Sequence, residues 1–450
     1  MTLADQAPPS ARPPWPPAGP GEPAEPQPPP RRRSRVRVVA VAVAVALVLA
    51  GNGAALFLID RQGDGPATVE PPADATPTTA VDEPATAPAP VEPPIPTTAP
   101  TTSTVPRTPV ERAVAELSAF VADQRELEFL RPVAVELLDD EAFVDRLLDG
   151  SEENRAETDN SEKVLRALGL IGPDVDLFDT FIDFYRTSVL GFYDPESDEL
   201  VLRGAELTPY VRTTLVHELS HALDDQHFEL HRPEVDEADD ESSLAFSALI
   251  EGVSVTIEMA YSQTLSASEQ EELDREAAEF ARRGAGSRIP PIVTQLAQFP
   301  YLFGPFFLGA LLDQGGEARV DAAFREPPTT SEEILDPSVY LREEAPIAVS
   351  QPASDGFRPI DQGSYGQWAL YLTLDQHLDS ETANRASDGW GGDSYVAWDQ
   401  GSGTCVRMAF AMDTPADLAD LESAWRRWAG AHGDTTVERA GELVTVTACG

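Results

Sequence analysis

Basic residues are scarce in this sequence. It has 32 Lys and Arg residues against 77 Asp and Glu residues, a formal net charge of −45, and Lys163 is its only lysine. Acidic residues dominate nearly everywhere after position 60. Because a strongly negative surface repels polyanions, the composition argues against nucleic acid or anionic lipid as a partner of the folded part of the chain.

Two N-terminal stretches lack the apolar residues that a folded core requires. Most of the 41 prolines lie in the first 110 positions. Residues 1–35 are predicted to be a disordered, Pro-rich cytoplasmic tail that ends in a basic flank. Residues 60–109, rich in Pro, Thr and Ala, are predicted to be a disordered linker that acts as a tether.

The stretch between them lacks charge. No charged residue occurs from Val38 to Ile59, and the run of Val, Ala and Leu is long enough to cross a bilayer. Residues 36–59 are therefore predicted to form one transmembrane helix. The arginines within 31–37 place the N-terminus in the cytoplasm and the C-terminal domain outside it. Secretion after removal of a signal peptide is the alternative.

Cysteine is limited to Cys405 and Cys449. In an extracytoplasmic domain they can form a disulfide that closes a loop of about 45 residues and contributes about 4 kcal/mol in the chain-entropy model. The segments around both cysteines have the composition of strands that could pair. The sequence favours this bridge over two free buried thiols.

Residues 110–450 carry the patterns of an α+β, mainly helical, extracytoplasmic domain, with a possible C-terminal α+β lobe at 345–450. The apolar run at 299–312 is short and interrupted by Pro and Gly, so a core helix is expected there rather than a second membrane span. Further patterns are a strand at 132–137, a hairpin at 191–202, and helices at 177–189 and 269–283.

Histidine is also rare, with six residues in the chain, yet two of them form an HExxH motif. On a helix, His217 and His221 share one face, so both imidazoles can point at a single metal ion. Glu218 is rotated off their axis and would reach the water of the metal, as a general base must. Thr208 and Pro209 are a typical N-cap and first residue for such a helix.

A catalytic zinc ion usually has three protein ligands. Glu251 is the preferred third ligand, because it is the only ionisable residue in the apolar helical run 244–256, and Gly252 beside it would let this helix approach the first one closely. His227 is the alternative, in a string that matches HExxHxxGxxH except that Asp224 replaces the glycine; it can reach the metal only if the helix breaks. The other acids left open as ligands are Asp239, Asp240, Glu241 and Glu258.

The HExxH motif followed by Glu251 resembles the gluzincin group of zinc metallopeptidases. The strings HELSHALDDQHFEL (217–230), GFYDPESDEL (191–200) and PPTTSEEILDP (327–337) are similar to largely uncharacterised bacterial HExxH proteins. The resemblance implies a zincin-like core with a small sheet. Gluzincins often carry an acid four residues after the ligand glutamate, which orients a histidine. That position is Val255 here, so the orienting group is expected elsewhere.

We therefore expect a membrane-anchored extracytoplasmic metallopeptidase that binds one zinc ion (Zn2+) through His217, His221 and Glu251, with Glu218 as the catalytic base. Its partners would be a peptide or protein substrate and, through the transmembrane helix, the membrane. The alternative is a non-catalytic envelope or substrate-binding protein with a structural or vestigial metal site; hydrolysis of a non-peptide amide is a weaker option. Possible transition-state donors are Tyr193, His231, Tyr261, Tyr301 and Tyr365.

Overall fold

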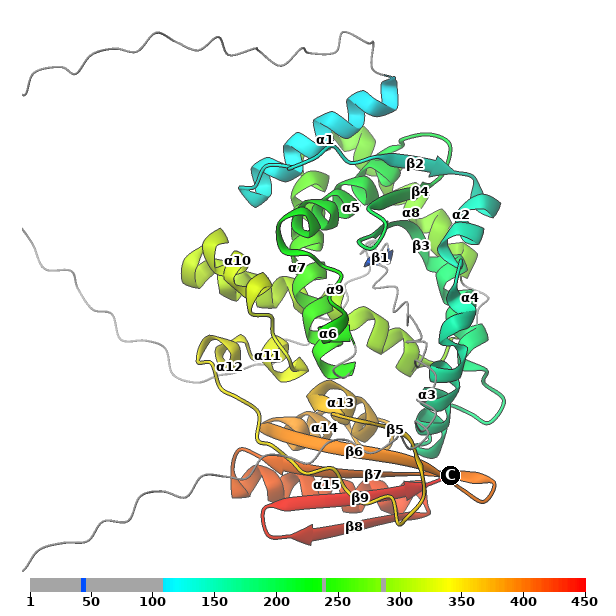
Figure 1. The fold of residues 1–450 in the computed structure, drawn as a ribbon, viewed down its shortest axis with the longest axis vertical. Coiled ribbons are helices and arrows are strands. Elements are labelled where there is room, and N and C mark those ends of the chain that lie inside the picture. Colours follow the sequence, from blue (N-terminus) through cyan, green and yellow to red (C-terminus); the bar gives the residue numbers. More distant parts are fainter. Residues whose placement is uncertain (1–41, 46–107, 237–239, 285–288) are drawn as a thin grey trace, which may run out of the picture.

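The computed structural model describes residues 42–45, 108–236, 240–284 and 289–450 (Figure 1). The predicted tail lies outside the described residues, as does the linker apart from its last two positions. The described chain is α+β and mainly helical, as predicted. It has a mainly helical N-terminal part and a C-terminal part built on a larger sheet.

Only four residues of the predicted transmembrane segment are described, and they form a strand. β1 (Ala42–Val45) pairs antiparallel with β3 (Val189–Asp194). Over these residues the structure differs from the predicted helix, because alternating Val and Ala suits extended backbone and β3 without β1 would have an unpaired edge. The rest of 36–59 lies outside the described residues, so the membrane crossing stays a prediction.

The smaller sheet has the strand order β1-β3-β4-β2. The predicted hairpin is confirmed as β3 and β4 (Glu199–Arg203), which pair antiparallel, and β2 (Val135–Leu138) adds parallel to β4. Leu200 and Leu202 pack in the core that contains the HExxH helix, whereas Val201 packs with Phe143 in a separate cluster. Both faces of the hairpin are therefore buried, and one of them supports the HExxH motif.

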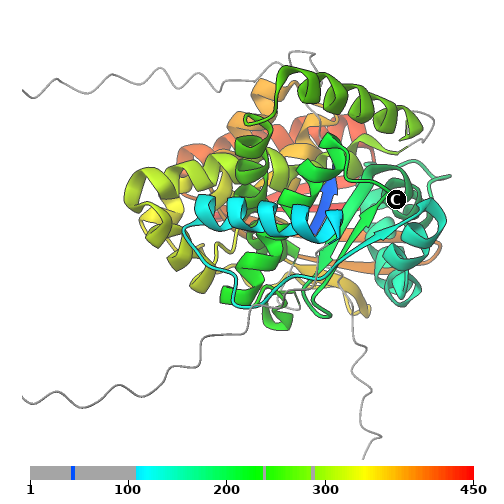
Figure 2. The ribbon, with the colours of Figure 1, turned by 90° about the horizontal axis from the view of Figure 1, so that it is seen from above.

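In the N-terminal part, α1, α7 and α8 pack around α5, which carries the HExxH motif (Figures 1 and 2). α7 is apolar and long enough to cross a membrane by length and composition, but half of that stretch is buried and the helix packs against α5 and α9. The predicted core helix at 299–312 lies within α9, where Phe299 and Phe307 are fully buried. The helices of this part are α1 (Pro109–Arg125), α2 (Asp140–Leu147), the 3-10 helix η1 (Ser151–Asn154), α3 (Arg155–Ala167), α4 (Leu177–Ser188), α5 (Pro209–Phe228), α6 (Pro233–Asp236), α7 (Asp240–Ser262), α8 (Ala267–Gly284), α9 (Pro291–Gly315), α10 (Glu317–Arg325), α11 (Ser331–Leu335) and α12 (Pro337–Leu341).

Two glycines set the distance between α7 and α9. A Cβ atom on Gly252 would lie 2.5 Å from the carbonyl carbon and oxygen of Gly304, closer than real side chains approach. Gly252 therefore allows a close approach between two helices, as predicted. The helix that approaches α7 at this point is α9, however, and not α5, because Gly304 of α9 supplies the matching small residue.

The C-terminal part is a five-stranded antiparallel sheet with helices packed on it. Its strand order is β5-β6-β7-β9-β8. Cys405 and Cys449 face each other across β7 and β9 and form a disulfide, as predicted. α15 packs its buried Trp425 and Trp428 against the face that carries Phe410. The elements are β5 (Pro359–Gly363), α13 (Gly366–Asp375), α14 (Ser380–Ser387), β6 (Trp390–Gln400), β7 (Gly403–Met412), α15 (Pro415–His432), β8 (Thr435–Ala440) and β9 (Leu443–Cys449).

Candidate metal centre

The helix that carries the HExxH motif begins where the sequence predicts. Pro209 is the first residue of α5, and the side chain of Thr208 accepts a hydrogen bond of 3.3 Å from the backbone N–H of Val211. The helix is buried on nearly every side, because α1, α7, α8 and the β3–β4 hairpin all pack against it. The polar residues in its middle therefore lie inside the protein.

Glu251 of α7 lies beside both histidines of the motif. Its Oε2 atom is 3.0 Å from Nε2 of His217 and 3.6 Å from Nε2 of His221. The side chains of the three residues are almost completely buried, and one ligand atom from each lies within 4.8 Å of the others. Two imidazole nitrogens and a carboxylate oxygen at this spacing could hold a metal ion, although this donor set is not specific to zinc.

Several polar atoms at this cluster have little support from the protein. His221 Nε2 lies 3.6 Å from Oε2 of Glu251, and the Glu218 carboxyl group lies near the backbone of Tyr193. Neither His221 Nε2 nor the carboxylate oxygens of Glu218 make a hydrogen bond of normal geometry within the described part of the chain. A buried polar group without a partner costs free energy, so such atoms are rare in native proteins. A metal ion at His221, with its water near Glu218, would satisfy them. The residues present therefore fit a metal centre.

The second nitrogen of each histidine is held by α7. His217 Nδ1 donates to Glu258 Oε2 at 2.9 Å, and a hydrogen bond of 3.1 Å joins His221 Nδ1 to Ser254 Oγ. Such contacts fix the ring orientation and leave the other nitrogen facing a metal. The expectation that the orienting acid lies elsewhere than Val255 is thus met by Glu258, which follows Glu251 by two helical turns and shares its face. The spacing of Glu251 and Glu258 in the sequence could have indicated that both lie on the same face of this helix.

Burial and nearby carboxylates act in opposite directions on these groups. Burial disfavours the charged form of His217, but hydrogen bonds to Glu251 and Glu258 hold its pKa well above the usual value. Burial, together with the charge on His217, lowers the pKa of His221 well below its usual value. Burial also raises the pKa of Glu251. A proton on His217 Nε2 then bridges to Glu251, a role that a metal cation would take over.

The carboxyl group of Glu218 is fully buried. Burial raises its pKa well above the usual value, while the charge on His217 opposes this rise. A Cβ atom on Gly191 of β3 would lie 3.4 Å from Cγ of Glu218, so the strand passes directly over this side chain. A raised pKa makes the carboxylate a stronger base, which suits a group that first accepts a proton and later delivers it.

Of the five candidate transition-state donors, Tyr301 is the one whose hydroxyl contacts a predicted ligand. It donates to Oε1 of Glu251 at 3.0 Å, and its ring stacks on His217 with centroids 6.3 Å apart. The hydroxyl groups of Tyr193 and Tyr365 bond to Asp225 and Thr373 instead. Tyr261 packs edge-on against Phe120 in the core, and His231 is exposed.

His227 does not join the cluster, because α5 continues unbroken past Asp224 to Phe228. Its Nε2 atom contacts the carbonyl oxygen of Glu128 at 2.8 Å. Asp224 is buried in an ion pair with Arg125 at 2.9 Å, and burial raises its pKa to about 6. This buried pair was not predicted, since the sequence does not show that α1 lies across α5.

The remaining acids considered as ligands lie elsewhere or outside the description. Glu241 accepts hydrogen bonds from the backbone N–H and the hydroxyl of Ser331, so it holds the start of α11. Asp239 and the side chain of Asp240 are outside the described residues. Glu258 contacts the histidine ring rather than completing the cluster of ligand atoms.

Comparison with known families matches the C-terminal part of the chain only. Residues 355–449 match a domain of unknown function, DUF8575, which spans β5 to β9 and includes none of the residues of the metal centre. No curated protein and no solved structure matches the chain.

Proposed function

We propose that this protein is a zinc-dependent metallopeptidase with a gluzincin-type, zincin-like core, anchored in the membrane with its folded part outside the cytoplasm. His217, His221 and Glu251 would hold one zinc ion. The observation that carries this proposal is the buried cluster in which His221 Nε2 and the Glu218 carboxylate oxygens make no hydrogen bond of normal geometry among the described residues. Two imidazoles and one carboxylate are a ligand set of catalytic zinc, which keeps a further position open.

Bound zinc would supply polarisation of the scissile carbonyl and a lowered pKa of water. Glu218 would accept a proton at a carboxylate oxygen from the attacking water and deliver it to the leaving amine as the C–N bond breaks. Glu258 and Ser254 would keep the two imidazoles in their ligand orientation. Tyr301 would hold the Glu251 carboxylate in its ligand orientation through its hydrogen bond to Oε1.

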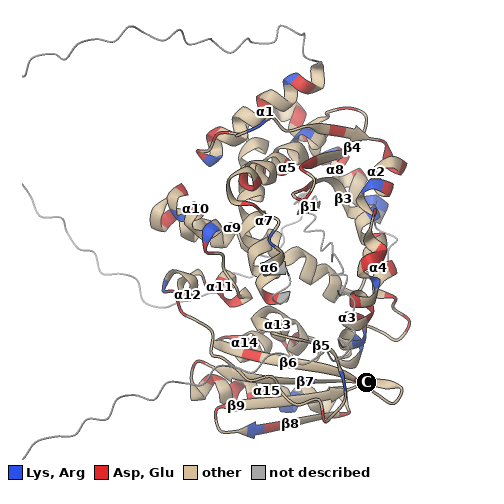
Figure 3. Cartoon of the chain, in the orientation of Figure 1, with Lys and Arg blue, Asp and Glu red and all other residues tan. Residues whose placement is uncertain are grey.

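The disulfide supports the proposed location. Disulfides form and persist in oxidising compartments, and both cysteines of the chain are used in one. The uncharged run and its basic flank support a single membrane anchor with a cytoplasmic N-terminus. In the anchored form Ala42–Val45 would lie in the bilayer and leave β3, because these residues cannot take both positions at once. Acidic residues lie on both halves of the described chain in Figure 3, in keeping with a partner other than nucleic acid.

A second candidate is a non-catalytic envelope or substrate-binding protein with a structural metal. The observation in its favour is burial, since His217 is 1% and His221 0% exposed. A structural zinc site normally has four protein ligands. His227, the fourth ligand that would close the site, contacts Glu128 instead. The arrangement therefore favours the peptidase.

The test uses the full chain purified in detergent. We expect about one zinc ion per chain, and cleavage of members of a broad peptide library. Glu218→Gln should keep the metal and lower kcat by at least about a thousandfold, because the proton acceptor is lost. Glu271→Gln, at an exposed acid on α8, is the matched control. Hydrolysis that survives Glu218→Gln unaltered would refute the mechanism, and zinc bound without turnover would support the second candidate.

A further inference from the structure

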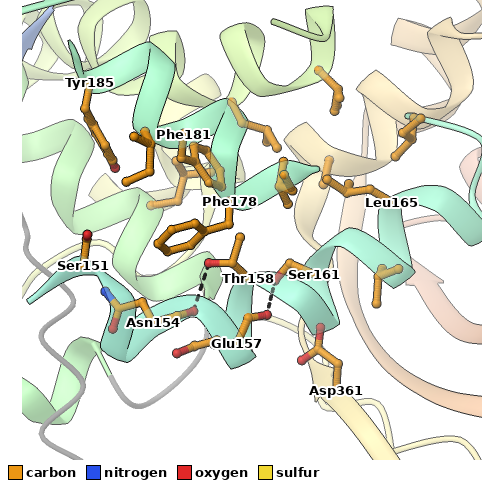
Figure 4. A pocket seen from close by; sticks show the side chains of 18 of the residues that line it. Ser151, Asn154, Glu157, Thr158, Ser161, Leu165, Phe178, Phe181, Tyr185 and Asp361 are labelled. Carbon is orange, nitrogen blue, oxygen red and sulfur yellow. Dashed lines mark hydrogen bonds between the residues drawn. The ribbon is translucent and has the colours of Figure 1, made fainter. Parts of the chain in front are cut away.

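A pocket of about 470 Å³ lies between the N-terminal helices and the start of the C-terminal part (Figure 4). Its lining is mostly apolar. Leu244 of α7 and Leu296 of α9 contribute to it, and α4 supplies a row of large side chains at helical spacing. That row consists of Phe178, Phe181, Ile182 and Tyr185.

The polar residues of this pocket are uncharged or acidic. None of its lining residues is Lys or Arg, whereas Asp149, Glu157 and Asp361 are among them. In Figure 4, Glu157 and Asp361 lie on the side opposite Phe181. The guanidinium of Arg155 stacks on the Phe178 ring at 3.9 Å, but it is already paired with Glu152. The pocket therefore suits a large apolar group and disfavours a carboxylate, which would lose its hydration and meet like charge.

Three elements lead from this pocket to the metal centre. On α7, Leu244 precedes Glu251 by about 10 Å of helix, and on α9, Leu296 precedes Tyr301 by about 8 Å. On the third path, Tyr185 ends the apolar row of α4, and the chain continues into β3, where Gly191 lies over Glu218. The pocket and the metal centre are therefore neighbours along the same elements.

The direction of β1 indicates how an extended segment can run past the metal centre. Ala42 pairs with Tyr193 and Val45 with Val189, so β1 passes Gly191 and proceeds toward α4. A chain that continued in this direction would leave the metal centre and reach the row of α4 side chains. The distance from Gly191 to Tyr185 is about 15 Å of strand and helix.

We propose that this pocket binds bulky apolar side chains of the substrate and excludes acidic ones. Because β3 is paired with β1 on one side and β4 on the other, the substrate segment would take the place of β1 beside β3, and the pocket lies on the C-terminal side of that segment. The inference rests on the proposed peptidase function and specifies its substrate class. An extended peptide advances about 3.3 Å per residue, so the pocket receives residues about four to five positions after the one opposite Gly191.

The first test compares two fluorescent peptides that share an extended Ala/Val segment. One carries Leu and Phe about four to six positions further on, and the other carries Asp there. Binding is measured by fluorescence polarisation to zinc-loaded, full-length Glu218→Gln protein. Burial of two large side chains predicts an affinity for the apolar peptide that is at least about tenfold higher. Equal affinities, or preference for Asp, would overturn the inference.

Two substitutions test whether the preference for the apolar peptide arises in this pocket. Phe181→Asp should remove it, whereas Phe357→Asp, at an exposed phenylalanine of the C-terminal part, should keep it. If Phe181→Asp does not fold, Asp361→Asn provides a milder test, in which the penalty against the Asp peptide should shrink several-fold. Oleate is the competing occupant. Tight oleate binding together with equal peptide affinities would assign the pocket to an acyl chain and refute the proposal.

Turnover by the wild-type protein separates the two proposals. Cleavage of both peptides with the same kcat/KM refutes the pocket inference and leaves the peptidase standing. A retained binding preference without any cleavage supports the pocket and counts against the peptidase. Cleavage of the apolar peptide with a kcat/KM at least about tenfold higher supports both.

Discussion

The two halves of the described chain bury different kinds of side chain. Around α5 the core contains His217, Glu218 and Glu251, whereas the C-terminal sheet encloses four fully buried tryptophans: Trp390, Trp398, Trp425 and Trp428. An ionisable group that is buried without a partner destabilises the fold, whereas a buried aromatic side chain stabilises it. The contrast indicates that the C-terminal half supplies stability, while the N-terminal half holds groups that a stable core alone would not need.

Among the substitutions that test this contrast, Trp428→Ala should have the largest effect on stability. Trp428 is fully buried and donates from Nε1 to the carbonyl oxygen of Thr373 at 2.8 Å. We expect a loss of about 3–5 kcal/mol in the free energy of unfolding, measured by urea denaturation. The zinc affinity of the native protein should not change. Arg427→Ala, at the exposed neighbouring residue, is the control, and a parallel fall in zinc affinity would break the separation of roles.

Removal of the disulfide by Cys405→Ser with Cys449→Ser should have the next largest effect. The bridge closes a loop with a sequence separation of 44 residues within the C-terminal sheet. Disulfides typically contribute about 2–4 kcal/mol, and the chain-entropy model gives about 4 kcal/mol for this loop, so we expect a loss of this size in unfolding free energy, visible as a lower urea midpoint. Peptide hydrolysis below the unfolding transition should be preserved. Loss of hydrolysis in protein that is still folded would show that the two halves are coupled.

Glu258→Gln tests the N-terminal half. It weakens the acceptor that orients His217, so zinc affinity should fall about 10- to 100-fold in competition with a chelator. The unfolding free energy of the metal-free protein should change by less than for Trp428→Ala. Glu271→Gln is the exposed control. Unchanged zinc affinity would mean that Glu258 does not position the ring.

The smallest predicted effect concerns Glu332, a partly buried acid on α11. Burial, with Asp413 and Glu344 nearby, raises its pKa to about 8. A carboxyl group whose folded pKa is raised contributes stability that is present below its unfolded pKa near 4.5 and is lost as the pH rises through about 8. Glu332→Gln should therefore raise Tm by about 2–4 °C at pH 9 and leave it unchanged at pH 4.

The control for this prediction is Glu343→Gln, at an exposed acid close in sequence. An equal rise in Tm at both pH values would contradict the titration of Glu332. It would point to packing or local conformation as the source of the stabilisation. The result also shows whether costly buried charge occurs outside the metal centre.

Local sequence was sufficient for several features. Thr208 and Pro209 mark the start of α5, and helical spacing puts His217 and His221 on one face, because both depend on backbone geometry within a few residues. Glu251 was identifiable because a single acid in an apolar helix needs a partner. The β3–β4 hairpin and the Cys405–Cys449 pairing follow from strand patterns and from the only two cysteines.

Other features depend on which elements pack together. Gly252 meets α9 rather than α5, Asp224 pairs with Arg125 of α1, and β1 replaces part of a predicted helix. None of these follows from periodicity, because periodicity identifies a buried face without identifying its neighbour. The same holds for the apolar pocket, whose walls come from segments far apart in the chain.

The HExxH helix and its candidate ligands were thus accessible from sequence, since their spacing alone constrains the chemistry. The tertiary structure decided how they are used. Crossing of α7 over α5 places Glu251, and not His227, beside both histidines, brings Glu258 to His217, and leaves the Glu218 carboxylate buried without a hydrogen bond of normal geometry among the described residues. The physical reason is that ligand spacing on one helix is set by the backbone, whereas the third ligand and the orienting groups are set by the packing of a second helix.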